Sequence, residues 1–178
     1  MEQKRKNVSP FSNEARNVYV VEHITASMLD RLKTQAIEEI SISDLCNDAG
    51  VGRTSFYRNF ESREDIVRKH LRKLFKEWAE DWESSGEESP AKMYGSLFAY
   101  LKKYSGLFQL LQKRGLMHLM LEIYLERYGA TEEDPNIWAY TKSFIAYGTY
   151  GWMVEWLNRG MPESAETMAV LLSSHGMK

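Results

Sequence analysis

The residues from Arg53 to Asn59 place guanidinium, hydroxyl and phenol groups along one side of a short predicted helix. Phe56 and Phe60 stand four residues apart and would face inward. The outer face then holds hydrogen-bond donors, hydroxyls and an aromatic ring, but no carboxylate. Such groups meet base edges and phosphate oxygens when a helix lies in a major groove. The chemistry indicated is recognition of a nucleic acid.

A second short helix must come just before this one and hold it in place. Ser41 is a suitable N-cap for it, with Asp44 reaching back from the third helical position. Gly50 supplies the backbone freedom of a sharp turn, and the Val51 side chain would pack into the corner between the two helices. The apolar side of this helix is given by Leu45, Cys46 and Ala49.

These residues resemble the helix-turn-helix of the TetR family of transcriptional regulators. The matching elements keep a fixed register: Ser41 to Cys46, Ala49-Gly50-Val51, Ser55-Phe56-Tyr57 with Phe60, and Ser62-Arg63-Glu64-Asp65-Ile66. Cys46, Gly52, Asn59 and Glu61 stand where the family usually has other residues.

The resemblance implies a regulator, expected to be a repressor, that binds a palindromic double-stranded DNA operator as a homodimer. We assign base reading to Arg53, Thr54, Ser55 and Tyr57, although Tyr57 could equally hold a phosphate. The phosphate contacts are assigned to Ser41, Arg58, Asn59 and Arg63. The scaffold residues are Leu45, Ala49, Gly50, Val51, Phe56 and Phe60.

The charge distribution favours the same interpretation. The whole chain of 178 residues carries a formal charge of −2, but residues 1–74 hold 13 basic and 11 acidic side chains. Residues 51–74 hold seven basic and three acidic ones, whereas residues 75–178 hold 10 against 14. A basic segment on an otherwise acidic chain would orient the protein on a polyanion.

Other functional classes lack their characteristic residues. No nucleophile elbow, phosphate-binding glycine loop or carboxylate–histidine site is visible, so an enzyme is not expected and no cofactor is implied. His118 and Glu122 could share a metal, but Glu126 continues the stripe as a polar face, so no metal is expected. A single cysteine and no apolar run of membrane-spanning length predict a cytoplasmic protein without a membrane partner.

The pattern of caps and apolar spacing predicts an all-α chain. We expect a flexible arm over residues 1–12, a helix-turn-helix DNA-binding domain over 13–61, and a connecting helix over 62–83. The polar break from Ser84 to Pro90 then begins a C-terminal effector and dimerisation domain over residues 84–178. A capping box at Ser62 and Asp65 begins the connecting helix, and a cap at Ser89 begins the helix after the break.

Residues 136–158 predict one helix that is apolar nearly all round and therefore buried on several sides. Gly148 and Gly151 fall near one stripe and would let a second backbone approach closely. The spacing from Phe144 to Gly160 also resembles the C-terminal region of one TetR subgroup, which implies dimerisation through residues 136–174. The expected interface residues are Gly148, Gly151, Trp152, Glu155, Trp156, Met168 and Leu172.

TetR-like proteins commonly hold a small effector between their middle helices, which implies a pocket for an apolar or aromatic molecule. Its expected lining residues are Tyr94, Phe98, Phe108, Met117, Met120, Tyr124 and Tyr147, each of which could instead simply fill the core. An alternative function is a regulator that acts on a protein partner through its C-terminal domain. Asn59 and Glu61 leave that alternative open, because they weaken the expected phosphate contacts.

Overall fold

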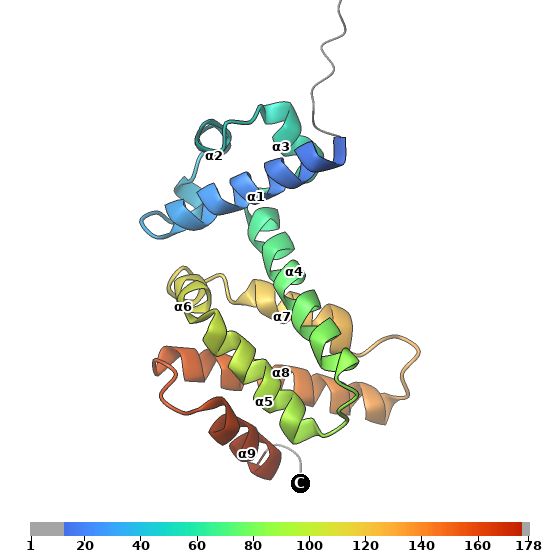
Figure 1. The fold of residues 1–178 in the computed structure, drawn as a ribbon. Coiled ribbons are helices and arrows are strands. Elements are labelled where there is room, and N and C mark those ends of the chain that lie inside the picture. Colours follow the sequence, from blue (N-terminus) through green and yellow to red (C-terminus); the bar gives the residue numbers. More distant parts are fainter. Residues whose placement is uncertain (1–12, 176–178) are drawn as a thin grey trace, which may run out of the picture. The chain divides into compact units, whose positions relative to one another are not determined.

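The computed structural model describes residues 13–175, and over this range it contains helices and turns but no strand (Figure 1). The predicted all-α fold is confirmed. The proposed arm over residues 1–12 lies outside the described residues. The chain divides into two compact units, one ending at Val67 and the other beginning at Arg68. This division falls inside helix α4, Arg63–Ser84, so one continuous helix contributes to both units.

The N-terminal unit is built on the 20-residue helix α1, Asn13–Leu32. A 3-10 turn (η1, Ile37–Glu39) leads into the short helices α2, Ile42–Asp48, and α3, Arg53–Asn59, which both pack against α1 (Figure 1). The core of this unit is mostly apolar and includes Ile24, Met28, Leu32, Leu45, Phe56, Phe60 and Ile66. Burial of these side chains, rather than the propensity of two seven-residue helices, stabilises the arrangement.

The caps of α2 agree with the sequence in part. The Ser41 hydroxyl accepts a hydrogen bond from the Ser43 N–H at 3.1 Å, so the predicted N-cap is confirmed. The predicted return contact of Asp44 is not formed, because its carboxylate lies 3.7 Å from the Arg31 guanidinium of α1 instead. At the other end, the backbone of Gly50 has a φ of 63°. This left-handed conformation closes α2 and turns the chain into α3.

Among the described residues, six helices belong wholly or largely to the C-terminal unit. After α4 they are α5, Pro90–Lys103; α6, Ser105–Lys113; α7, His118–Tyr128; α8, Asn136–Asn158; and α9, Ala165–His175. Helices α5 and α9 pack along one another, while α8 contacts α6 and α7. The predicted caps at Ser62 and Ser89 are both present, with hydroxyls that accept from the N–H groups of Asp65 and Lys92.

Two helix boundaries differ from the expectation. The spacing of the glycines predicts a short helix over residues 107–113 and a longer one from Gly115 to Tyr128, but Gly106 lies inside α6 and α7 begins at His118. Gly115 has a φ of 70° and its N–H bonds the Gln112 carbonyl, so this glycine ends α6. Over the described part of the chain, no helix combines the length and apolar character required to cross a membrane.

Candidate functional site

The outer face of α3 is the clearest candidate site in the N-terminal unit. Phe56 and Phe60 are 0% and 1% exposed, and their ring centroids lie 5.6 Å apart. They hold the helix against the core, which leaves the opposite face to solvent. Tyr57 is 61% exposed, and Arg53, Thr54 and Arg58 are exposed as well. Ser55 and Asn59 are half-buried at the edge of this face.

The turn before α3 fixes the angle at which this face is presented. The Val51 N–H bonds the Cys46 carbonyl at 2.9 Å and the Gly50 N–H bonds the Asn47 carbonyl at 3.1 Å. This pair of bonds is the Schellman closure of α2. Cys46 and Ala49 are buried beneath the turn, and burial raises the pKa of the Cys46 thiol. The two short helices therefore form one rigid helix-turn-helix unit.

Two contacts that the sequence did not reveal brace this unit. Arg53 donates from Nη2 to the Ser43 hydroxyl, which ties the start of α3 to α2. Asp48 accepts hydrogen bonds from Arg31 at 2.6 Å and from the Ser27 hydroxyl at 3.0 Å, which ties α2 to α1. The Arg31 guanidinium lowers the pKa of the Asp48 carboxyl. Neither contact follows from local spacing, since the partners are 10 to 21 residues apart in sequence.

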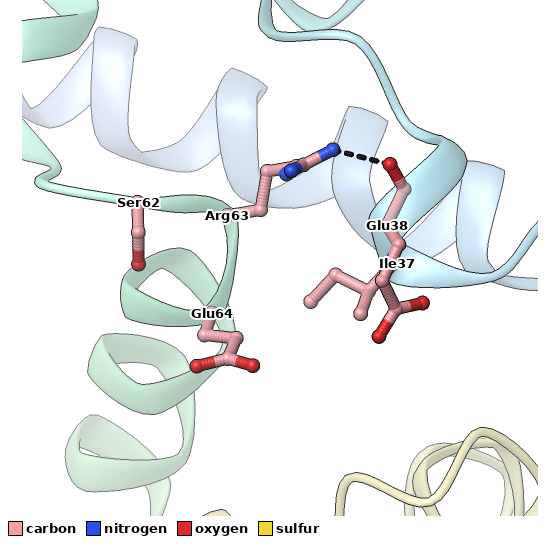
Figure 2. A pocket seen from close by; sticks show the side chains of 5 residues that line it. All are labelled: Ile37, Glu38, Ser62, Arg63 and Glu64. Carbon is pink, nitrogen blue, oxygen red and sulfur yellow. Dashed lines mark hydrogen bonds between the residues drawn. The ribbon is translucent and has the colours of Figure 1, made fainter.

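The four proposed phosphate residues have different surroundings. Ser41 and Arg58 are exposed, whereas the Asn59 side chain donates to the Ser55 carbonyl at 2.9 Å. Arg63 is half-buried, and Figure 2 shows its guanidinium directed at Glu38. It donates to the carbonyl oxygens of Glu38 and Ile40 at 2.6 and 3.0 Å. Arg63 therefore closes the turn after η1, a role that the sequence pattern did not suggest.

Two arginines of the basic segment pair with carboxylates of the C-terminal unit, so they are not free to contact a nucleic acid. Within the C-terminal unit, Arg68 pairs with Glu122 at 3.0 Å and Arg72 with Glu126 at 2.8 Å. Glu122 and Glu126 thus form ion pairs between α4 and α7, whereas His118 Nδ1 lies 3.0 Å from the Gly115 carbonyl oxygen. No group of three potential metal ligands occurs among the described residues. The excess of positive charge expected after α3 is reduced accordingly.

The expected effector pocket is mostly core. Tyr94, Phe98, Phe108, Met117 and Met120 are at most 3% exposed, and the space next to Phe108 and Met120 amounts to about 10 Å³. That is room for one water at most. Tyr147 lies outside this core and is 56% exposed on α8. Tyr124 of the expected set borders a larger cavity, of about 350 Å³. Lining and core-filling residues are of the same apolar types, so the sequence did not separate them.

The expected interface residues divide between core and surface. Trp156, Met168 and Leu172 are 2–4% exposed, with the Trp156 ring 5.1 Å from that of Phe98. They pack inside the bundle, whereas Gly148, Gly151 and Glu155 are exposed and Trp152 is half-buried. Glu155 forms an ion pair at 2.7 Å with Arg159, four residues further along the chain. Trp152, Trp156 and Met168 also border a groove of about 360 Å³ between α8 and α9.

The apolar surface that α8 exposes is larger than the set of interface residues expected on this helix. Five large side chains of α8 are 56–69% exposed: Ile137, Trp138, Tyr140, Phe144 and Tyr147. All but Trp138 fall on the helical stripe that continues through Gly148 and Gly151. Val170 of α9 is 65% exposed as well. Contiguous exposed apolar side chains of this size mark an interaction surface.

An all-helical chain with a braced helix-turn-helix and a separate helical bundle has the organisation of a transcriptional regulator. Residues 88–175 match the TetR family model described as a transcriptional regulator C-terminal region. This match supports a transcriptional regulator of the TetR family. No curated protein matches the chain.

Proposed function

We propose that the protein is a DNA-binding regulator that lays α3 into the major groove of an operator. The observation that carries this proposal is the α3 face itself. Arg53, Thr54, Tyr57 and Arg58 are exposed together, while Phe56 and Phe60 fix the helix to the core behind them. Arginine and hydroxyl groups on an exposed, rigidly held helix suit contacts to base edges and phosphates.

The proposed assembly is a homodimer that binds a palindromic operator. The exposed apolar stripe of α8 supports it, because a helix with Phe144 and Tyr147 in solvent is stabilised by covering that face. A Cβ added to Gly148 or Gly151 would meet no atom within 4 Å, so a second backbone has room to approach these glycines. Two-fold symmetry would place two copies of α3 in half-sites about 34–36 Å apart, or at a related spacing.

The decisive experiment is fluorescence anisotropy against DNA from upstream of the gene, with a scrambled duplex of equal length, over a salt series. We expect tight binding to the upstream fragment that saturates at two chains per site. Binding to both duplexes that is equal, weak and steeply salt-dependent is the non-specific pattern. That result would reject operator recognition on this fragment.

Arg53→Ala separates base reading from simple attraction to phosphate. If Arg53 contacts a guanine, its loss should weaken specific binding by about 1–3 kcal/mol and relax the base preference at one position. Ser43→Ala is the matched control, since it removes the hydroxyl that Arg53 contacts and keeps the guanidinium. A uniform loss on all sequences in Arg53→Ala would remove Arg53 from the base-reading set.

Repression is the mode of action that we expect, because a dimer seated on a promoter would exclude polymerase. The second candidate is a regulator that acts on another protein through its C-terminal domain. The exposed stripe of α8 and the groove beside Trp152 favour it, since both could receive a partner helix. A monomer in solution that shows no preference between the two duplexes would favour this second function.

A further inference from the structure

The cavity beside Tyr124 has the size of a small-molecule site. It measures about 350 Å³ and lies where α5, α7, α8 and the segment between α7 and α8 meet. Its apolar wall includes Met93 and Ile145 and the rings of Tyr124 and Tyr128, whose centroids are 5.2 Å apart. A wall of two aromatic rings and branched or flexible aliphatic groups suits an aromatic or branched ligand body.

The charged groups of this cavity share one sign. Arg127 and Lys142 border it, and no carboxylate does so among the described residues that line it. This contrasts with the surrounding sequence, since residues 75–178 hold 14 acidic against 10 basic side chains. The Arg127 guanidinium lies 5.8 Å from the centroid of the Tyr128 ring, at the boundary between the aromatic wall and the cationic edge. A ligand with an apolar body and an anionic end group matches both parts.

Each cation already has a carboxylate partner, and the two pairs differ in exposure. Lys142 contacts both oxygens of Asp134 at 2.7 Å, and the Asp134 side chain is only 16% exposed. Arg127 pairs with Glu83 of α4, whose side chain is 58% exposed. An exposed ion pair contributes little to stability, so Glu83 is the partner that an incoming anion can replace. A guanidinium also presents a planar fork that binds a carboxylate or sulfonate through two hydrogen bonds.

We propose that this cavity binds an organic anion with an aromatic or branched apolar body, that Arg127 anchors its acidic group, and that the ligand displaces Glu83. Glu83 belongs to α4, the helix that continues into the N-terminal unit. Ligand binding therefore acts on a helix whose first residues belong to the DNA-binding unit. This regulatory consequence rests on the proposed function, whereas the binding site itself does not.

The site is tested on the full chain without DNA by fluorescence titration with two matched probes. One is 8-anilinonaphthalene-1-sulfonate, and the other is N-phenyl-1-naphthylamine, which has the same aromatic body and no charge. We expect the sulfonate to saturate at one molecule per chain. Arg127→Gln should weaken the sulfonate about tenfold or more, which is the range of a charge-assisted hydrogen bond, and leave the neutral probe within about twofold.

The variant Glu83→Gln tests the direction in which sulfonate affinity changes. Both Arg127→Gln and Glu83→Gln break the same ion pair, so a purely structural role would change binding in the same direction. Displacement of Glu83 instead predicts that Glu83→Gln strengthens sulfonate binding while Arg127→Gln weakens it. Lys76→Gln removes a comparably exposed pair with Glu80 on α4 and should change neither probe.

Equal affinity of wild-type protein for the two probes would overturn the proposal, because the cationic edge would then contribute nothing. Parallel changes in the two variants would overturn it as well. Since the titration contains no DNA, its outcome is separate from operator recognition. If the protein binds the sulfonate as described but binds no operator specifically, the proposed function is rejected and the proposed ligand site stands.

Discussion

Arg58 and Arg63 lie five residues apart and were both expected to hold phosphates, but their surroundings differ. Arg58 is exposed on the last turn of α3, whereas Arg63 donates to the carbonyl oxygens of Glu38 and Ile40. The carbonyls that follow a helical turn are satisfied by such donors, and a charged donor strengthens the bond. The two residues should therefore respond differently to truncation.

Arg58→Ala is expected to lower affinity for every DNA sequence and to reduce the salt slope of binding by about one. Its effect on the free energy of unfolding should stay within about 0.5 kcal/mol, as for other exposed positions. Arg63→Ala should instead lower the free energy of unfolding by about 1–3 kcal/mol, because two backbone acceptors lose their donor. Urea denaturation and anisotropy measure the two quantities separately.

A result for Arg63→Ala that resembles the one expected for Arg58→Ala would contradict the structural role of Arg63. If Arg63→Ala keeps full stability and lowers the salt slope as Arg58→Ala does, its guanidinium leaves Glu38 and Ile40 to contact the DNA backbone. The assignment of Arg63 to the phosphate set would then hold. Anisotropy must be read without denaturant and well below the unfolding midpoint, so that loss of folded protein does not imitate loss of affinity.

At the scale of elements, the turn between α2 and α3 contains two glycines, of which Gly50 has a backbone conformation that disfavours a side chain and Gly52 does not. Gly50 has a φ of 63°, whereas Gly52 has an ordinary extended backbone (φ −78°, ψ 151°) and is the N-cap of α3. Gly50→Ala should destabilise the protein by about 1–2 kcal/mol, because a Cβ is strained in the left-handed region. Thermal unfolding followed by circular dichroism measures the change.

Gly52→Ser should have the opposite effect at the same turn. Nothing lies within 4 Å of a Cβ at Gly52, and the Gly52 cap has no side-chain hydrogen bond. A serine there adds a cap acceptor and restricts the unfolded chain, which together should stabilise by about 0.5–1 kcal/mol. Equal destabilisation by both substitutions would show that the turn as a whole, rather than the φ of Gly50, limits what it accepts.

Helix α4 carries a half-buried histidine that makes stability depend on pH. Burial lowers the pKa of His70, Lys73 lowers it further, and Glu77 acts in the opposite direction. The unfolded state therefore binds a proton more readily than the folded state. Stability should fall as the pH drops from 7 through about 6.5 and toward the lowered folded pKa. His70→Gln should remove this slope, as measured by urea denaturation between about pH 5 and 7.5.

Local signals predicted helix boundaries well because caps act within four residues. Ser41 and Ser89 begin their helices as expected, and α8 has the predicted bounds Asn136–Asn158. Long-range pairs such as Arg63 with Glu38 or Arg72 with Glu126 have no local signature, so the sequence assigned those residues other roles. The composition of α8 showed that its apolar sides need cover, but not whether that cover comes from within the chain.

The same lack of long-range information explains why several residues expected at the effector pocket and at the interface are buried in the core. Phe98 and Phe108 were expected to line a pocket, yet they are buried in the core, while Arg127 and Lys142 border the cavity beside Tyr124. Whether an aromatic side chain faces a void depends on how neighbouring helices are spaced, which a single helix pattern does not encode. The cationic edge was equally hidden, since Arg127 and Lys142 lie on different helices.

At the scale of the whole molecule, the proposed homodimer would make operator recognition depend on the exposed stripe of α8. Phe144 is 69% exposed at the middle of this stripe, one turn before Gly148. Phe144→Glu should convert the proposed dimer to a monomer, because a charge buried without a partner in the proposed apolar interface is costly. Sedimentation velocity over a concentration series measures the assembly state. Ala99→Glu, which adds the same charge at an exposed position of α5, should leave the dimer intact.

The monomeric variant should also lose operator affinity although α3 is unaltered. Two linked reading helices gain from effective concentration, and separating them removes an advantage of roughly 10²-fold or more. Affinity for a single half-site should remain as in the wild-type protein, since Phe144 lies outside the N-terminal unit. Full operator affinity in a Phe144→Glu monomer would mean that the two chains pair on DNA through another surface. The stripe of α8 would then be the docking surface for a different protein, as the second candidate function requires.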